Sequence, residues 1–296
     1  MAATNTSEPA PKQSRAGRNL PAAISVGVLL GGLIIVALAW LPTWAWVAIV
    51  AAAIAVATHE VVRRLRENGY VIPLIPLLLG GQAMIWLTWP ALNAVDQHRG
   101  NTAGALGAFA GTVLVCLIWR LLAQGPNAAP QNYLRDVAVT LMVAAWIPLF
   151  GAFAVMLIYP DDGRKALFTI LLAVVFSDIG GYTAGVLFGK HPMVPAISPK
   201  KSWEGFAGSL TAGTAMAVLA VVFLMHQQWW IGIPLGIFLV ITGTLGDLVE
   251  SQFKRDLGIK DMGTLLPGHG GLMDRIDSIL PAMPAGWIVL AVLTGG

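Results

Sequence analysis

Charged residues are scarce in this chain. Only 11% of its 296 residues are Asp, Glu, Lys or Arg, whereas a soluble domain carries about 25%. Hydrophobic residues account for 56% of the chain. This composition excludes an ordinary soluble domain and indicates an integral membrane protein.

Cysteine and net charge are also low. The chain has one cysteine, Cys116, which lies in an apolar run, so an intrachain disulfide is excluded. The formal net charge of +3 is too small to indicate a protein that binds nucleic acid. We find no internal repeat and no separate soluble domain.

Long apolar segments are what the chain has in quantity. A helix needs about 20 apolar residues to cross about 30 Å of hydrocarbon. Nine segments approach that length: 20–41, 44–62, 71–90, 103–124, 136–159, 166–188, 205–226, 229–248 and 278–294. We therefore expect an all-α, polytopic integral membrane helical bundle with about nine transmembrane helices.

The distribution of cations predicts how these helices are oriented. With the N-terminus in the cytoplasm, 15 of the 18 Lys and Arg residues fall on the inner side, and Arg99, Arg164 and Lys165 fall outside. Cytoplasmic loops carry such an excess of cations. We expect residues 1–18 to form a disordered cytoplasmic tail, 19–165 to hold the first five helices, and 166–296 to form a C-terminal region with cytoplasmic loops 189–204 and 249–277.

Carboxylates and cations crowd around the second of these loops. Residues spaced three and four apart at the end of the eighth segment share one helix face: Asp247, Glu250, Ser251 and Lys254. Asp274 and Asp277 follow, one turn apart, at the start of the last segment. Carboxylates from two neighbouring helix ends are suitable ligands for Mg²⁺. Ion pairs with the nearby lysines and arginines are an equally open alternative.

Two further segments have features of phosphate-binding loops. The glycines of PGHGG, residues 267–271, allow exposed backbone N–H groups to contact phosphate; a simple turn before a helix is the alternative. In SPKKSWEG, residues 198–205, Ser198-Pro199 predicts a helix start, and Ser202 is a candidate N-cap. Lys200 and Lys201 would then lie near a helix N-terminus, where anions bind, although the topology rule alone also explains them.

A few ionisable residues lie inside apolar segments. Asp178, in the sixth segment, is expected to face a cavity or a partner, with a structural carboxylate as the alternative. His59 and Glu60 end the second segment, and they fit a structural anchor or a site lining equally well. In the sixth segment, Gly181, Gly185 and Gly189 are spaced four apart, which favours close helix packing.

The residues from 251 to 277 resemble the C-terminal pattern of phosphatidate cytidylyltransferases, also called CDP-diacylglycerol synthases. The matching residues are Ser251, Lys254, Arg255, Lys260, Asp261, His269, Gly270, Gly271, Asp274, Arg275 and Asp277. The SPKKSWEG loop and the segment around Asp178 are also similar to the family. The resemblance covers about residues 170–296, which it identifies as the catalytic region.

The resemblance implies that CTP and phosphatidic acid are converted to CDP-diacylglycerol and pyrophosphate at the cytoplasmic face of the cell membrane. It implies Mg²⁺ as cofactor, with K⁺ as a candidate second cation, and a homodimer as a candidate assembly. Asp247 and Asp274 would bind the metal. The other implied catalytic residues are Lys254, Arg255, Lys260, Arg275 and Asp277. The implied substrate-binding residues are Asp178, Ser198, Lys200, Lys201, His269, Gly270 and Gly271.

Two other classes of membrane protein compete with this interpretation. A secondary transporter would use Asp178, Glu60 and Asp247 as cation or proton sites, but we find no paired halves in the chain. A CDP-alcohol phosphotransferase would carry a dense run of four aspartates, which we do not find. CTP-dependent release of pyrophosphate on addition of phosphatidate distinguishes the three.

Overall fold

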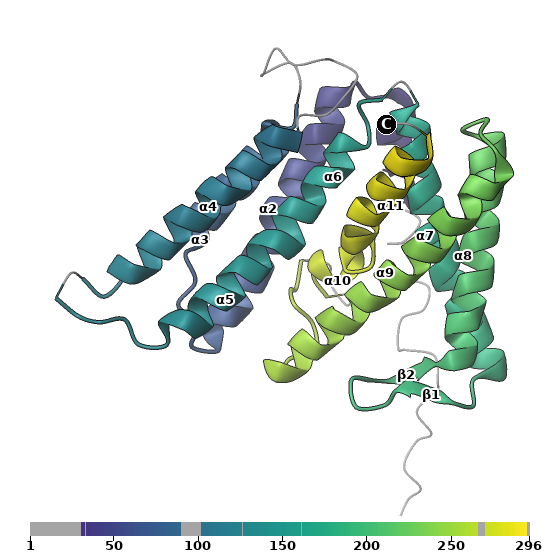
Figure 1. The fold of residues 1–296 in the computed structure, drawn as a ribbon. Helices are drawn as coiled ribbons and strands as arrows, with labels where there is room; N and C mark the ends of the chain where they lie inside the picture. Colours follow the sequence, from purple (N-terminus) through teal and green to yellow (C-terminus); the bar gives the residue numbers. More distant parts are fainter. Residues whose placement is uncertain are drawn as a thin grey trace, which may run out of the picture.

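The computed structural model describes residues 31–32, 34–89, 102–125, 127–160, 162–265 and 270–294. Within them it is a helical bundle with one small hairpin of strands (Figure 1). The elements are α2 (Thr43–Glu67), α3 (Leu74–Trp86), α4 (Thr102–Leu122), α5 (Tyr133–Ala144), the π-helix η2 (Ala145–Leu149), α6 (Phe150–Met156), α7 (Gly163–Phe188), β1 (Pro192–Val194), β2 (Ser198–Ser202), α8 (Trp203–Phe223), α9 (Trp229–Asp256), α10 (Met273–Ile276) and α11 (Ile279–Thr294). The expectation of a helical membrane protein is confirmed.

Seven of the described helical segments are long and apolar enough to cross a membrane. The eighth expected span is α3, whose 13 residues reach only about 20 Å at 1.5 Å per residue. The ninth, 20–41, lies mostly outside the described residues, although residues 34–40 are helical. The tail at 1–18 lies outside them as well. A total of nine spans and the orientation of the N-terminus therefore stay predictions.

Prolines mark where several of these helices begin or bend. Pro42 is the non-helical residue before α2, as expected from its place between the first two apolar segments. Pro148 lies inside the π-helix η2, which joins α5 and α6 into one span, Tyr133–Met156. Because proline has no N–H to donate, a proline within a helix disturbs the regular hydrogen-bond ladder.

Glycines bring α7 and α8 into close contact, and the two helices lie side by side in Figure 1. The Cα of Gly205 lies 3.7 Å from the Cβ that an alanine at Gly185 would carry. A Cβ on Gly181 would meet the Ser209 side chain. The small residues of α7 therefore serve the close crossing that their spacing predicts.

Helix α9 packs on α8 only over its first half. Gly232 and Gly236 of α9 lie against the backbone of Val218 and Thr214 of α8. Beyond that region α9 runs diagonally away from α8 toward the end of the bundle that carries the hairpin (Figure 1). It continues to Asp256, two turns past the expected end at 248. The diverging helices create space for a site.

The hairpin formed by β1 and β2 joins α7 to α8. The strands are antiparallel, and Pro192 pairs with Ser202. The prediction that Ser198-Pro199 starts a helix is wrong, because these residues belong to β2 and the helix begins at Trp203. The predicted N-cap is confirmed: the Ser202 Oγ accepts a hydrogen bond from the Gly205 N–H at 3.1 Å.

Candidate active site

A cavity of about 500 Å³ lies where α9 diverges from α7 and α8. The hairpin contributes to one side of it, and α10 and the two residues between α10 and α11 contribute to another. Its charged lining residues are Asp178, Lys200, Lys201, Asp247, Lys254, Asp274 and Asp277. All seven were singled out from the sequence, and the fold brings them together from segments up to about 100 positions apart.

Three carboxylates form the acidic centre of this region. Asp247 and Glu250 come from α9, and Asp277 follows α10; one oxygen of each lies within 4.8 Å of the others. Glu250 is fully buried, and its Oε1 has no hydrogen-bond partner among the described residues. A buried carboxylate oxygen without a donor is costly, so this atom is suited to a cation. We call these three residues the acidic triad.

Lys254 links the acidic triad to Asp274. Its Nζ lies 2.5 Å from Glu250 Oε2 and 3.0 Å from Asp274 Oδ1. Glu250 and Lys254 are four residues apart on α9, so the helix itself aligns the pair. The prediction that Asp247, Glu250 and Lys254 share a helix face is confirmed.

Asp274 is held by several donors. Besides Lys254, it accepts hydrogen bonds from the Gly271 N–H at 2.7 Å and from the Met262 N–H at 3.0 and 3.2 Å. These bonds occupy both carboxylate oxygens. Asp247 and Asp274 do line one cavity, but the group of oxygens suited to a metal contains Glu250 and Asp277 with Asp247. The predicted pairing of Asp247 with Asp274 at a metal stays a prediction.

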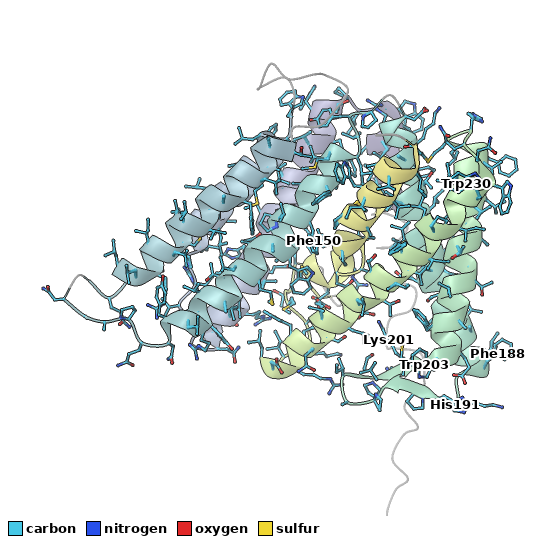
Figure 2. All side chains as sticks on the ribbon, in the orientation of Figure 1. Phe150, Phe188, His191, Lys201, Trp203 and Trp230 are labelled. Carbon is cyan, nitrogen blue, oxygen red and sulfur yellow. The ribbon has the colours of Figure 1, made fainter. Side chains whose placement is uncertain are left out.

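Lys201 reaches the acidic triad from the hairpin. Its Nζ lies 2.6 Å from Asp247 Oδ2 and 3.4 Å from the carbonyl oxygen of Thr244. Figure 2 places this side chain between the hairpin and α9. Lys200 is exposed and lines the same cavity. Two cations therefore lie beside the N-terminus of α8, whose dipole also favours anions.

The hairpin is tied to α9 by Arg255. Its Nε donates a hydrogen bond to the carbonyl oxygen of Ile197, which lies in the turn between the two strands. This bond fixes the strand that carries Lys200 and Lys201 relative to the helix that carries Asp247. Arg255 thus has a structural partner in addition to its predicted catalytic role.

Several predicted residues are not part of the cavity wall. Among the described residues, those that do not line it are Ser198, Arg255, Lys260, Gly270, Gly271 and Arg275. His269 lies outside the described residues. Gly270 has a φ of +85°, a backbone conformation that glycine adopts more readily than other residues.

Two carboxylates were not among the site residues predicted from the sequence. Glu250 was predicted to share a helix face with Asp247 but was not included among the site residues. Its position one turn after Asp247 could have indicated that it belongs to the site. Glu60, on α2, accepts hydrogen bonds from the backbone of Leu272 and Met273. No local pattern connects it with residues more than 210 positions away. Its neighbour His59 is exposed.

Comparison with known proteins agrees with this arrangement. Residues 22–293 match the model of a family described as the cytidylyltransferase family. The chain is 57% identical over 294 residues to a phosphatidate cytidylyltransferase of Mycobacterium bovis, covering 97% of this chain and 93% of the relative. It is 56% identical over 290 residues to one of Mycobacterium leprae, covering 94% and 90%. A more distant relative of the same name, from Staphylococcus haemolyticus, is 39% identical over 172 residues, covering 58% and 65%.

Proposed function

This chain belongs to the cytidylyltransferase family, and we propose that it converts CTP and phosphatidic acid to CDP-diacylglycerol and pyrophosphate. The observation that carries the proposal is the cavity itself, which joins three lysines and four aspartates at one end of membrane-spanning helices. CTP is soluble and phosphatidate is a lipid, so a site for both must lie where the membrane meets water. The relatives named phosphatidate cytidylyltransferase support this substrate pair. These relatives give no support to the alternative interpretations of the chain as a secondary transporter or a CDP-alcohol phosphotransferase.

We propose that the acidic triad binds Mg²⁺. Its three residues offer only oxygen ligands, which Mg²⁺ prefers, and protein sites for this ion are commonly completed by substrate phosphates. The buried, unpartnered Glu250 Oε1 supports a cation at this position. When bound, the ion would offset negative charge on the phosphates. A second cation such as K⁺ stays a prediction, with Asp178 as a candidate ligand in the cavity.

The chain's own residues need to position the two substrates and to supply positive charge. An oxygen of the phosphatidate phosphate attacks the α-phosphorus of CTP; a new P–O bond forms, the bond to the β-phosphate breaks, and pyrophosphate leaves. A phosphate monoester has a second pKa of about 6, by analogy with phosphoserine, so the attacking oxygen needs no strong base. Lys200, Lys201 and Lys254 lie where they can neutralise the phosphates of both substrates. Positioning and charge neutralisation are the main contributions to such transfers.

The cavity is proposed to face the cytoplasm, where CTP is present. The excess of Lys and Arg at the cytoplasmic side of the predicted topology supports this orientation. We propose that this membrane is the cell membrane, as the family resemblance implies. A homodimer stays a prediction from the family resemblance, and the mass of the detergent-solubilised protein would test it.

The direct test is release of pyrophosphate from CTP by the purified chain in detergent. Release should require phosphatidate, and diacylglycerol, which has no phosphate to attack with, should not replace it. Asp247→Asn should abolish turnover, because it removes a charge of the acidic triad, while the variant still inserts and elutes as the wild type does. Absence of pyrophosphate release by the wild-type chain with both substrates would refute the proposed function.

A further inference from the structure

The carboxylate of Glu60 crosses from α2 to the loop that precedes α10. Its Oε1 accepts a hydrogen bond from the Leu272 N–H at 3.2 Å, and its Oε2 accepts one from the Met273 N–H at 3.0 Å. The N–H groups of a first helical turn have no partner within the helix. Glu60 is buried, so both oxygens are engaged away from solvent.

Two glycines make room for this carboxylate. A Cβ on Gly263 would collide with Glu60 Oε1, and a Cβ on Gly271 would lie 2.5 Å from Glu60 Oε2. Neither glycine has a positive φ, so other residues could adopt its backbone conformation. These glycines are therefore explained by the close approach of Glu60, and the loop is shaped around this side chain.

Arg64 provides a second contact from the same face of α2, one turn after Glu60. Its Nε donates a hydrogen bond to the Met262 carbonyl oxygen at 3.0 Å. Met262 is buried and donates its own N–H to Asp274. Helix α2 thus contacts the segment between α9 and α10 at two places: at Met262, and at Leu272 and Met273 where α10 begins.

These contacts continue into the candidate active site. The Gly271 N–H and the Met262 N–H, on either side of the Glu60 carboxylate, both donate to Asp274. Asp274 in turn holds the Lys254 Nζ, which also contacts Glu250 of the acidic triad. The path from α2 to the cavity is therefore unbroken: Glu60, loop backbone, Asp274, Lys254.

We propose that Glu60, assisted by Arg64, is a positioning residue for the cytidylyl transfer. Together they hold Met262 and the residues from Gly271 to Met273 in place, so that Asp274 directs Lys254 toward the phosphates. This inference rests on the proposed function for its catalytic consequence, but the contact itself does not. It also gives the N-terminal half of the chain a role in a reaction whose other residues come from the C-terminal half.

The first test is Glu60→Gln, which keeps the size of the side chain but replaces one acceptor oxygen with an NH₂ group that faces a backbone N–H. Groups that orient a site through its direct ligands typically contribute about 10–100-fold to activity. We expect kcat per folded enzyme to fall by about that factor, with the KM for CTP changing less than kcat. Activity would be measured as pyrophosphate release by the full chain in detergent.

Asp136→Asn is the matched control. Asp136 is also a fully buried carboxylate, and it pairs with Arg120 at 2.9 Å, but it lies on α5 and does not line the cavity. It should lower thermal stability without lowering kcat per folded enzyme. If Glu60→Gln behaves like this control, Glu60 only stabilises the fold and the proposal is wrong.

Hydrogen–deuterium exchange supplies a readout that needs no turnover. Glu60→Gln should speed exchange in the peptide spanning 270–277, whereas Asp136→Asn should leave that peptide unchanged. Unchanged exchange together with unchanged kcat in Glu60→Gln would overturn the inference. Failure of the wild-type chain to release pyrophosphate would refute the proposed function instead, and the exchange result would still report on the contact.

A double-mutant cycle tests the steric argument. Gly271→Ala should reduce kcat in the wild-type background, because the three atoms nearest its added methyl group all belong to the Glu60 carboxylate, at 2.5–2.7 Å. In a Glu60→Ala background, where that space is vacant, the further loss should be less than about threefold, since coupled sites are not additive. Gly111→Ala, on α4 with nothing within 4 Å of the added Cβ, is the control. Equal losses from Gly271→Ala in both backgrounds would contradict the proposal.

Discussion

Replacing Lys254 with methionine removes the cation whose Nζ contacts both Glu250 of the acidic triad and Asp274. The substitution keeps the length of the side chain and loses its charge. In the wild-type chain the Nζ makes two charge-assisted contacts, at 2.5 Å to Glu250 and 3.0 Å to Asp274. The side chains are 19%, 0% and 7% exposed, respectively. Glu250, at 0% exposure, therefore cannot replace the lysine with bulk water.

The structure allows the size of the effect to be estimated. Removing one partner of a buried ion pair costs about 3–5 kcal/mol, because the other charge stays buried without compensation. Two charge-assisted hydrogen bonds at about 1.5–3 kcal/mol each give a similar figure. We therefore expect Lys254→Met to lower stability by about 3–5 kcal/mol and the midpoint of thermal unfolding by on the order of 10 °C. Turnover should be lost, because the lysine also faces the cavity.

The assay is thermal unfolding of the detergent-solubilised chain beside pyrophosphate release. Lys165→Met is the matched control: Lys165 pairs with Asp162 at 2.7 Å, but the two side chains are 47% and 50% exposed. Exposed pairs contribute about 0–1 kcal/mol, so the control should unfold close to the wild type and keep its activity.

The double variant Lys254→Met/Glu250→Gln separates stability from catalysis. Neutralising Glu250 as well removes the uncompensated charge, and Asp274 keeps its bonds to the backbone of Met262 and Gly271. Most of the lost stability should return, while turnover should not. A Lys254→Met variant as stable and active as the Lys165→Met control would refute the reasoning, as would a double variant less stable than the single one.

Three further outcomes are expected. Lys201→Met should raise the KM for CTP about tenfold, which corresponds to about 1.4 kcal/mol, because a cation that faces the cavity is lost. If initial-rate measurements give an unchanged KM, Lys201 serves only to orient the chain in the membrane. Ser202→Ala should destabilise the chain by about 1 kcal/mol through loss of the bond from the Gly205 N–H, and an unaltered unfolding midpoint would argue against the cap. Chelation with EDTA should abolish pyrophosphate release and added Mg²⁺ should restore it, whereas full activity in EDTA would exclude the metal proposal.

The sequence predicts most of the helices because a span must satisfy its own backbone hydrogen bonds in lipid. That constraint makes hydropathy sufficient to find α4, α7 and α8 to within three residues at each end. It does not distinguish a full span from α3, which is apolar but only 13 residues long. Nor does it predict the β1–β2 hairpin, because Ser198-Pro199 carries the same local signal at a helix start as at the first residues of a strand.

The charged cavity was predictable for a related reason. A charge within an apolar span is expensive, so its presence indicates a function. Asp178 and Asp247 stand out on that ground alone, and they do line one cavity. Lys254 follows Glu250 by four residues, so helix geometry predicts that the two side chains lie on the same face. Helix α9 confirms that geometry because it remains helical to Asp256.

What the sequence could not reveal is how each carboxylate is employed. Asp274 and Glu250 are both acidic residues near helix ends, and their positions in the sequence do not show which of them binds a cation. The difference lies in their donors: Asp274 receives two backbone N–H groups and a lysine, whereas one oxygen of Glu250 receives none. Backbone donors come from the path of a loop, and that path is set in part by Glu60, more than 200 residues away. An acid satisfied by backbone N–H groups is suited to hold structure, and an acid with a vacant buried oxygen is suited to hold a cation, so assigning these roles requires the tertiary fold.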